Sequence, residues 1–247
     1  MTIECRPGDK DFLLAQLWEA GSVGIEEEDL APGKCRLLAF FEHPRDIAGE
    51  WRQEPDRDWV ALSQAQWQPV LCGDRFFLAP EWDDTATPPG RMRLTISPGR
   101  ASGTGYSTPT QLCLEALERA VQPDDIVLDI GTGSGILANA ARLLGARRVI
   151  ACDIDFDSVL EARRVAMEIF AGSARAVRSS SITLVVANLN YWGLTTLVRE
   201  ILRVAQREAR FVLGGFRPRR RAAVESLFGD VAAAYERDGW VCLYARK

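Results

Sequence analysis

One short stretch constrains the fold of this chain more than any other. Residues 126–137 run Ile-Val-Leu-Asp-Ile-Gly-Thr-Gly-Ser-Gly-Ile-Leu, so an apolar run gives way to glycine at every second position. Apolar residues then recur at helical spacing as far as Leu144, and a second apolar run ends on Asp153. This order predicts strand, tight turn, helix and strand, because glycines let the backbone bend sharply and let a ligand approach it closely. The pattern is typical of a doubly wound α/β sheet.

The spacing of the glycines indicates the kind of cofactor. The dinucleotide fingerprint is G-x-G-x-x-G, with a pyrophosphate on the helix N-terminus. Here Gly131, Gly133 and Gly135 are spaced as G-x-G-x-G, directly after Asp129. An acid at that point repels a pyrophosphate but can hold the ammonium group of an amino acid, and Asp153 can accept both hydroxyls of a ribose. We therefore predict S-adenosyl-L-methionine as the cofactor. NAD, or glycines that serve packing alone, remain alternatives.

Composition excludes several classes of function. The formal net charge of −4 argues against a general nucleic-acid binder, and the arginines at 217–221 are more typical of a solvated helix face. No stretch approaches the roughly 20 apolar residues of a membrane helix, and we expect no membrane partner and no secretory signal. The six cysteines form no C-x-x-C pair, which is typical of reduced thiols in a cytoplasmic protein. With His43 as the sole histidine, we expect no metal site and no histidine base. No oligomer signal is present, so we expect a monomer.

The periodicity predicts two domains and a linker. Helices over 9–20 and 44–51 and strands over 23–27, 35–41 and 76–80 predict a small α+β domain over residues 1–80. Residues 81–95 include Asp-Asp-Thr-Ala-Thr-Pro-Pro-Gly and are predicted to be a linker. A strand is expected over 92–96 and a polar, glycine-rich loop over 97–105. Segments with the apolar spacing of helices then alternate with segments typical of strands, and we predict an α/β domain over residues 96–247. The expected helices are 109–120, 134–144, 157–165, 193–206 and 219–227, and the expected strands are 126–130, 149–152, 167–170, 182–187, 210–213, 231–235 and 240–244.

A second group of polar residues follows another buried strand. The run over 182–187 is unbroken and apolar, and Asn188 stands at its end. In open α/β sheets ligands bind at the carboxyl ends of the strands. An asparagine there can accept from an amine, which helps to aim a nitrogen lone pair at a sulfonium methyl. Asn188 as a turn residue that only ends the strand is the alternative, but its place in the same sheet as the glycine turn favours a role in methyl transfer.

With both groups in place, the chain resembles the bacterial ribosomal-protein lysine methyltransferase family, PrmA, as a divergent member. The resemblance covers nearly the whole chain and includes segments 17–27, 57–59, 98–105, 126–137, 153–155, 186–189 and 239–247. It implies a seven-strand, Rossmann-like methyltransferase sheet over 96–247 and a small N-terminal ferredoxin-like domain that recruits the substrate. It also implies methylation of amino groups on protein eleven of the large ribosomal subunit.

The resemblance assigns roles to particular residues. Thr110, Gly131 and Asp153 match the family's cofactor-contacting threonine, turn glycine and ribose acid, and Asn188 matches the asparagine at the boundary between cofactor and substrate. Where the family loop carries histidine, this chain has Tyr106 and Ser107.

Two further departures concern the segment after Asp153. Phe156 stands in place of a proline, and the chain is several residues shorter between Asp155 and Asn188. The predicted cofactor-binding residues are Thr110, Asp129, Gly131, Gly133, Asp153 and Asn188, and the predicted catalytic residues are Asn188 and Tyr106. A degenerate cofactor-binding module and a small-molecule methyltransferase remain alternative functions.

Overall fold

The structure, a computed structural model, describes residues 1–31, 33–52, 67–97, 105–165 and 168–247. The chain divides into two compact units, Met1–Gln64 and Ala65–Lys247. The larger unit contains the glycine turn at residues 131–135. Segments 57–59 and 98–104, which contributed to the family resemblance, lie outside the described residues.

The smaller unit has an antiparallel sheet with a helix packed on it. Its strands are β1 (Thr2–Cys5), β2 (Gly24–Ala31) and β3 (Lys34–Phe40), in the order β1-β3-β2. Helix α1 (Lys10–Glu19) buries Leu17 against Leu37 and Ala39 of the central strand. This is the α+β arrangement expected for the N-terminal region.

The helix predicted over residues 44–51 is wrong, because the structure has bends and extended chain there. Glu50 instead exchanges two backbone hydrogen bonds with Thr2, of 2.8 and 2.9 Å. The Trp51 ring packs 5.3 Å from that of Phe41. Hydrogen bonding to a strand edge satisfies the backbone as well as a helix would, and Gly49 disfavours a helix. The apolar periodicity there reflects packing onto the small sheet. Strand β1 itself was not predicted.

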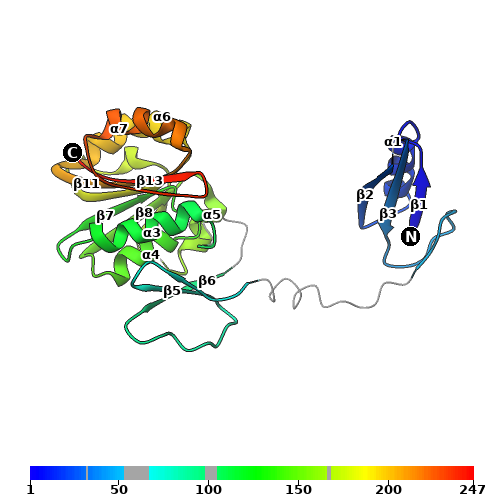
Figure 1. Ribbon diagram of the computed structural model, residues 1–247, viewed down its shortest axis with the longest axis horizontal. Coiled ribbons are helices and arrows are strands. Elements are labelled where there is room, and N and C mark those ends of the chain that lie inside the picture. The colour runs from blue at the N-terminus through cyan, green and yellow to red at the C-terminus, as the bar shows by residue number, and fades with distance from the viewer. Residues whose placement is uncertain (32, 53–66, 98–104, 166–167) are drawn as a thin grey trace. The chain divides into compact units, whose positions relative to one another are not determined.

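The larger unit is built on the predicted seven-stranded sheet (Figure 1). Its order is β12-β13-β11-β10-β7-β8-β9, and the five strands from β11 to β9 run parallel. Strand β13 is antiparallel to both of its neighbours. The strands are β7 (Ile126–Ile130), β8 (Arg148–Asp153), β9 (Glu168–Ala171), β10 (Ile182–Asn188), β11 (Ala205–Phe216), β12 (Asp230–Arg237) and β13 (Trp240–Arg246). The doubly wound fold class is therefore confirmed.

Helices cover both faces of this sheet, with α3 and α4 on one face and α6 and α7 on the other (Figure 1). Two buried clusters result, one on each face. Leu112 and Leu117 belong to the first cluster, and Leu194 and Ile201 belong to the second. The helices are α3 (Thr108–Ala120), α4 (Ile136–Leu143), α5 (Phe156–Ala162), α6 (Tyr191–Val204) and α7 (Arg221–Phe228), with 3₁₀ turns η1 (Ala174–Ala176) and η2 (Pro218–Arg220).

A second, three-stranded sheet also belongs to the larger unit. Strand β5 (Phe76–Pro80) pairs with β4 (Val70–Cys72), which was not predicted, and runs parallel to β6 (Met92–Ile96). Its buried side chains join the same apolar cluster as α3. The chain consequently divides into its two compact units between residues 64 and 65, whereas the sequence led us to place β5 in the first domain and a linker over 81–95. Pairing between β5 and β6 accounts for the difference, because periodicity along the chain does not reveal a partner strand.

A buried polar cluster lies at the amino ends of β7 and β10. The Arg210 guanidinium donates to the Ala120 carbonyl oxygen and forms an ion pair with the Asp125 carboxylate. The Thr183 hydroxyl donates 2.7 Å to the same carboxylate and accepts from the Ile126 N–H at 2.9 Å. These bonds join α3, β7, β10 and β11 at the sheet edge opposite the carboxyl ends of the parallel strands.

Candidate active site

The glycine turn begins directly after β7. The N–H groups of Gly131 and Thr132 both donate to the Cys152 carbonyl oxygen, at 2.9 and 3.1 Å, which fastens the turn to the end of β8. Gly131 has φ +69°, and a Cβ there would lie 2.6 Å from Leu189 Cδ2. Both the left-handed backbone and the close approach of a side chain require glycine. The absence of a side chain at this position thus allows close approach to the backbone of the turn.

The third glycine of the turn has a packing role. Gly135 has φ +81°, and a Cβ there would meet the Val165 side chain at 2.8 Å and that of Ala162 at 3.0 Å. Helix α4 begins at the next residue, so Gly135 allows α4 to start close to the end of α5. Packing alone therefore explains Gly135, whereas Gly131 and Gly133 face the end of β8.

Asp129 is buried beneath the turn. Its Oδ2 accepts from the Thr132 hydroxyl at 2.6 Å and from the Ala138 N–H at 3.1 Å. Its Oδ1 is buried and has no hydrogen-bond partner among the described residues. Burial raises the pKa of the Asp129 carboxyl to about 6; the bonds from Thr132 and Ala138 oppose that rise, and the charge of Asp153 adds to it. One buried carboxylate oxygen is therefore short of a donor or a cation.

Asp153 lies at the carboxyl end of β8, as predicted. Its Oδ2 accepts from the Gly133 N–H at 2.9 Å, and its Oδ1 accepts from the Asp155 N–H at 3.0 Å. Each carboxylate oxygen can accept a second hydrogen bond, so both remain available to a diol. The two backbone bonds hold the carboxylate in one orientation beside the glycine turn.

Thr110 and Asn188 lie far apart in the sequence and meet in the structure. The Asn188 side-chain amide donates 3.1 Å to Thr110 Oγ1, and the hydroxyls of Thr110 and Ser107 lie 2.9 Å apart. Thr110 is 1% exposed, and Asn188 is half-buried at the end of β10. Because Asn188 Nδ2 donates to Thr110, Asn188 Oδ1 is directed away from Thr110. Strand β10 also neighbours β7, as predicted.

The sequence reasoning missed two glycines beside Asn188. Asn188 pairs with Gly214 of β11, and a Cβ at Gly215 would lie 2.9 Å from Asn188 Oδ1 and 2.6 Å from the Leu189 carbonyl oxygen. Gly215 also has φ +91°. A Gly-Gly pair inside an apolar strand is the signal that could have located this close approach.

Tyr106 is directed away from the hydroxyls of Ser107 and Thr110. Its phenol donates 2.8 Å to the Gln68 carbonyl oxygen, and its ring packs edge-on against Trp67, with centroids 4.9 Å apart. Burial raises the pKa of the Tyr106 phenol, which favours the neutral donor form. The structure thus brings Thr110 and Asn188 together but engages the Tyr106 hydroxyl elsewhere.

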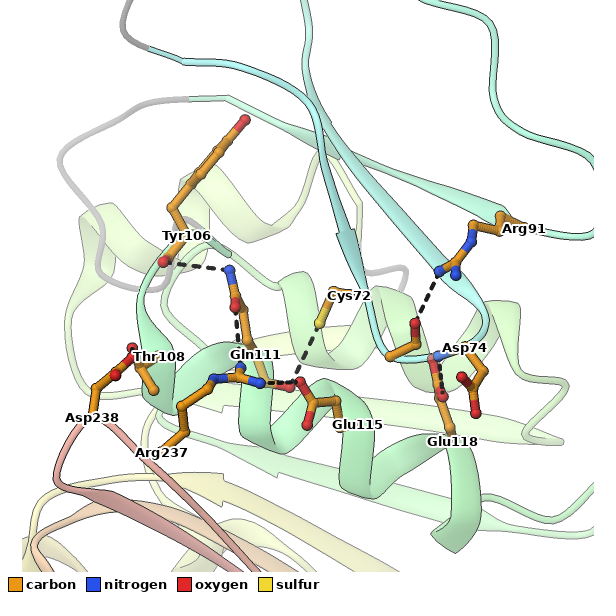
Figure 2. A network of polar contacts seen from close by, with 11 residues as sticks. Cys72, Asp74, Arg91, Tyr106, Thr108, Gln111, Glu115, Glu118, Arg237 and Asp238 are labelled. Carbon is orange, nitrogen blue, oxygen red and sulfur yellow. Dashed lines mark hydrogen bonds and ion pairs between the residues drawn. The ribbon is translucent and has the colours of Figure 1, made fainter.

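A polar network supports the start of α3 (Figure 2). Arg237 donates to Glu115 and Gln111, at 2.9 and 3.1 Å. The neighbouring Asp238 accepts from the Thr108 hydroxyl at 3.0 Å. These bonds tie the end of β12 and the turn between β12 and β13 to the first turns of α3, which carry Thr110 and follow Ser107. No single-sequence pattern links residues 108 and 238, so this support could not be predicted.

Within the described ranges, no group of three or more histidine, cysteine, aspartate or glutamate residues is arranged to hold a metal ion. In that same part of the chain, no helix is long and apolar enough to cross a membrane. All six cysteines are free thiols.

Comparison with known proteins gives one consistent result. A family model described as ribosomal protein L11 methyltransferase (PrmA) matches residues 17–247. The ribosomal protein L11 methyltransferase of Symbiobacterium thermophilum is 32% identical over 253 residues, covering 98% of this chain and 83% of the relative. That of Cupriavidus necator is 33% identical, covering 92% and 83%. Among solved structures, the ribosomal protein L11 methylase of Lactobacillus delbrueckii subsp. bulgaricus superimposes with a TM-score of 0.67 at 26% identity, covering 73% of this chain and 100% of that one.

Proposed function

The chain belongs to the ribosomal protein L11 methyltransferase (PrmA) family, and we propose that it transfers methyl groups from S-adenosyl-L-methionine to amino groups of a large-subunit ribosomal protein. The observation that carries the proposal is the bond from Asn188 to Thr110 at the same sheet edge as the glycine turn and Asp153. In an open α/β sheet this edge is where ligands bind. The alternative that the cofactor is NAD is rejected, because the family is one of methyltransferases.

The residues of the site fit this cofactor. Gly131 has no Cβ, so a neighbouring group can lie close to its backbone, as the Leu189 side chain does, and Asp153 keeps acceptor capacity for two ribose hydroxyls. The unpartnered, buried Oδ1 of Asp129 supplies negative charge toward the methionine ammonium group. Gly133 orients Asp153 through its N–H, and Thr110 lies beside the boundary between cofactor and acceptor. These are the roles we propose for the binding residues.

S-adenosyl-L-methionine, when bound, supplies the methyl group as an electrophile on a sulfonium. The chain contributes orientation. Asn188 Oδ1 accepts an N–H of the incoming amine and so points its lone pair along the line of attack. Thr110 holds the Asn188 amide, and Ser107 holds the Thr110 hydroxyl. A lysine ammonium loses its proton to solvent before the N–C bond forms, because Ser107, Thr110 and Asn188, which lie at the site, include no histidine base. We assign Tyr106 to support of the loop and leave the orientation of the amine to Asn188.

The unit Met1–Gln64 is proposed to recruit the protein substrate. Its separate compact fold supports that division of labour. The six free thiols support a reducing, cytoplasmic location, and we propose that the protein acts as a monomer without a nucleic-acid partner. Size-exclusion chromatography with light scattering checks the monomer.

Methyl transfer is tested with labelled cofactor and an extract of ribosomal proteins. Label in a protein of the size of large-subunit protein eleven supports the proposal. Asn188→Ala should abolish this label, while calorimetry should still detect cofactor binding, weakened by the loss of one contact. A non-enzymatic binding module would bind cofactor without transferring label, whereas a small-molecule methyltransferase would leave label in low-mass material alone. Asp153→Ala should weaken cofactor binding about tenfold or more, because buried or half-buried hydrogen bonds to a charged acceptor are strong. Unchanged binding in Asp153→Ala would remove the basis of the assignment.

A further inference from the structure

Three arginines follow β11 at the edge of the sheet that carries Asn188. Strand β11 ends at Phe216, and Arg217, Arg219 and Arg220 come next, in and before the turn η2. Asn188 pairs with Gly214 of the same strand, only three residues before Arg217. We refer to Arg217, Arg219 and Arg220 as the arginine rim. Sequence pattern alone favoured a solvated helix face for this run, but its position puts it beside the proposed acceptor site.

Aromatic rings hold two of these guanidinium groups in place. The Arg217 guanidinium lies 3.7 Å from the centroid of the Trp240 ring, and its Nη1 donates 3.1 Å to the Gly239 carbonyl oxygen. The Arg220 guanidinium lies 4.5 Å from the Tyr191 ring and 5.9 Å from the Trp192 ring. A guanidinium stacked on a ring keeps N–H donors at its edge, and these suit a planar carboxylate. Stacking also lowers the entropy lost when an anion binds.

The arginine rim is connected to the start of α3 and to the end of β10 by direct contacts. Tyr191 begins α6 three residues after Asn188, so its ring and Arg220 lie at the end of β10. Gly239, which binds Arg217, follows Asp238, and Asp238 accepts from Thr108 at the start of α3. The arginines therefore lie at the same end of the parallel strands as Asn188 and Thr110.

The positive charge of the arginine rim is poorly compensated. Arg221 forms an ion pair with Glu225, 2.7 Å away, but Arg219 has no hydrogen bond or ion pair among the described residues. The chain as a whole carries a formal charge of −4, so these three neighbouring arginines, for which the described residues provide ring and carbonyl contacts but no ion pair, oppose its general charge. Trp192, 69% exposed, adds an apolar contact surface beside them.

We infer that the arginine rim binds a carboxylate-bearing segment of the methyl-accepting protein, next to the amine that is methylated. The inference rests on the proposed function, because it places the acidic segment relative to Asn188. It means that glutamate or aspartate beside the acceptor amine favours transfer. A protein segment fits better than RNA, since the net negative charge repels a long polyanion while three guanidinium groups suffice for a few carboxylates.

Binding is tested with the full-length protein and two labelled peptides. Each carries one lysine, flanked by glutamates in one peptide and by glutamines in the other, and fluorescence anisotropy gives their dissociation constants at low salt. The test variant is Arg219→Glu, which leaves both ring-stacked arginines intact. Arg207→Glu is the matched control: Arg207 is exposed near the amino end of β11, at the opposite edge of the sheet. The glutamate peptide should bind the wild-type protein about fivefold more tightly, and Arg219→Glu alone should abolish that preference.

Several results would overturn the inference. These are equal binding of the two peptides, no measurable binding of either, or equal effects of Arg219→Glu and Arg207→Glu. A single-stranded RNA oligonucleotide that binds more tightly than the glutamate peptide, and loses affinity in Arg219→Glu alone, would assign the arginines to nucleic acid instead. Cofactor binding and methyl transfer to ribosomal protein are measured separately on the wild type. Failure of transfer with the peptide preference intact would contradict the proposed function and leave the arginine rim as a carboxylate site.

Discussion

Replacing Asp129 with asparagine should stabilise the free protein while it weakens cofactor binding. Burial raises the pKa of this carboxyl from 3.8 to about 6. A rise of that size corresponds to about 3 kcal/mol of free energy lost to holding the charged form in the folded protein at neutral pH. Asparagine removes the charge and keeps an oxygen for the Thr132 hydroxyl and the Ala138 N–H, which now bind Oδ2.

The expected net gain is smaller than the full electrostatic cost. The asparagine amide would take the place of Oδ1, which has no partner among the described residues, and an unsatisfied buried donor costs about 1 kcal/mol or more. We expect Asp129→Asn to raise the free energy of unfolding by about 1–2 kcal/mol at pH 7. For a unit of this size that is a rise in Tm of about 2–8 °C. Affinity for S-adenosyl-L-methionine should fall about tenfold or more, because the carboxylate that we propose for binding the ammonium group is gone.

The pH dependence has a definite sign. Because the folded pKa is above the unfolded one, the carboxyl contributes stability that is fully present below about pH 4 and is lost as the pH rises to about 6. The wild-type protein should therefore lose stability relative to Asp129→Asn across that window and show a constant difference above it. Urea unfolding followed by tryptophan fluorescence between pH 4 and pH 8 measures the difference. If Asp129→Asn proves less stable than the wild type at pH 7, the reasoning is refuted.

Three other substitutions probe different parts of the larger unit. Gly135→Ala should lower the free energy of unfolding by about 2–4 kcal/mol, because it places a Cβ on left-handed backbone, 2.8 Å from the Val165 side chain. Denaturant unfolding measures this loss, and a loss below about 0.5 kcal/mol would contradict the prediction. Thr110→Val should lower kcat about tenfold, because the Asn188 amide loses its acceptor, and should raise the KM for cofactor less, because Thr110 is also a proposed cofactor contact; an equal change in both constants would point to binding alone. Asp125→Ala should lower the free energy of unfolding by about 3–5 kcal/mol, because it leaves the Arg210 guanidinium buried without its counter-ion. A lower Tm and a lower urea midpoint would show this loss.

Local patterns in the sequence were enough to predict the sheet and the turn. The apolar run before Gly131, the spacing of the glycines and the helical spacing after them each belong to one short segment. The strand, the turn and the helix that they predict are all confirmed. The buried run that ends at Asn188 likewise predicted a strand beside β7. Such features depend on neighbours within a few residues, which is the range that a single sequence reports.

Other parts depend on contacts between distant residues. The parallel pairing of β5 with β6, the bridge from Thr2 to Glu50 and the bond from Thr108 to Asp238 join segments with no shared local signal. The position of Tyr106 could not be predicted either, because its hydroxyl donates to the Gln68 carbonyl oxygen, and a pattern of side chains does not predict a bond to a backbone atom. The roles of the individual site residues remain predictions that the substitutions above address.

The buried cluster around Arg210 and Asp125 has a consequence for how the molecule opens. It ties together α3, β7, β10 and β11 at the amino edge, while loops and exposed charges occupy the edge that carries Asn188. Fluctuations that admit a protein substrate can therefore be confined to the carboxyl ends of the parallel strands, while the amino ends stay rigid. In native-state hydrogen exchange, the amides of β7 and β10 nearest Asp125 should exchange only through global unfolding, whereas those of the loop at 105–107 should exchange through local opening.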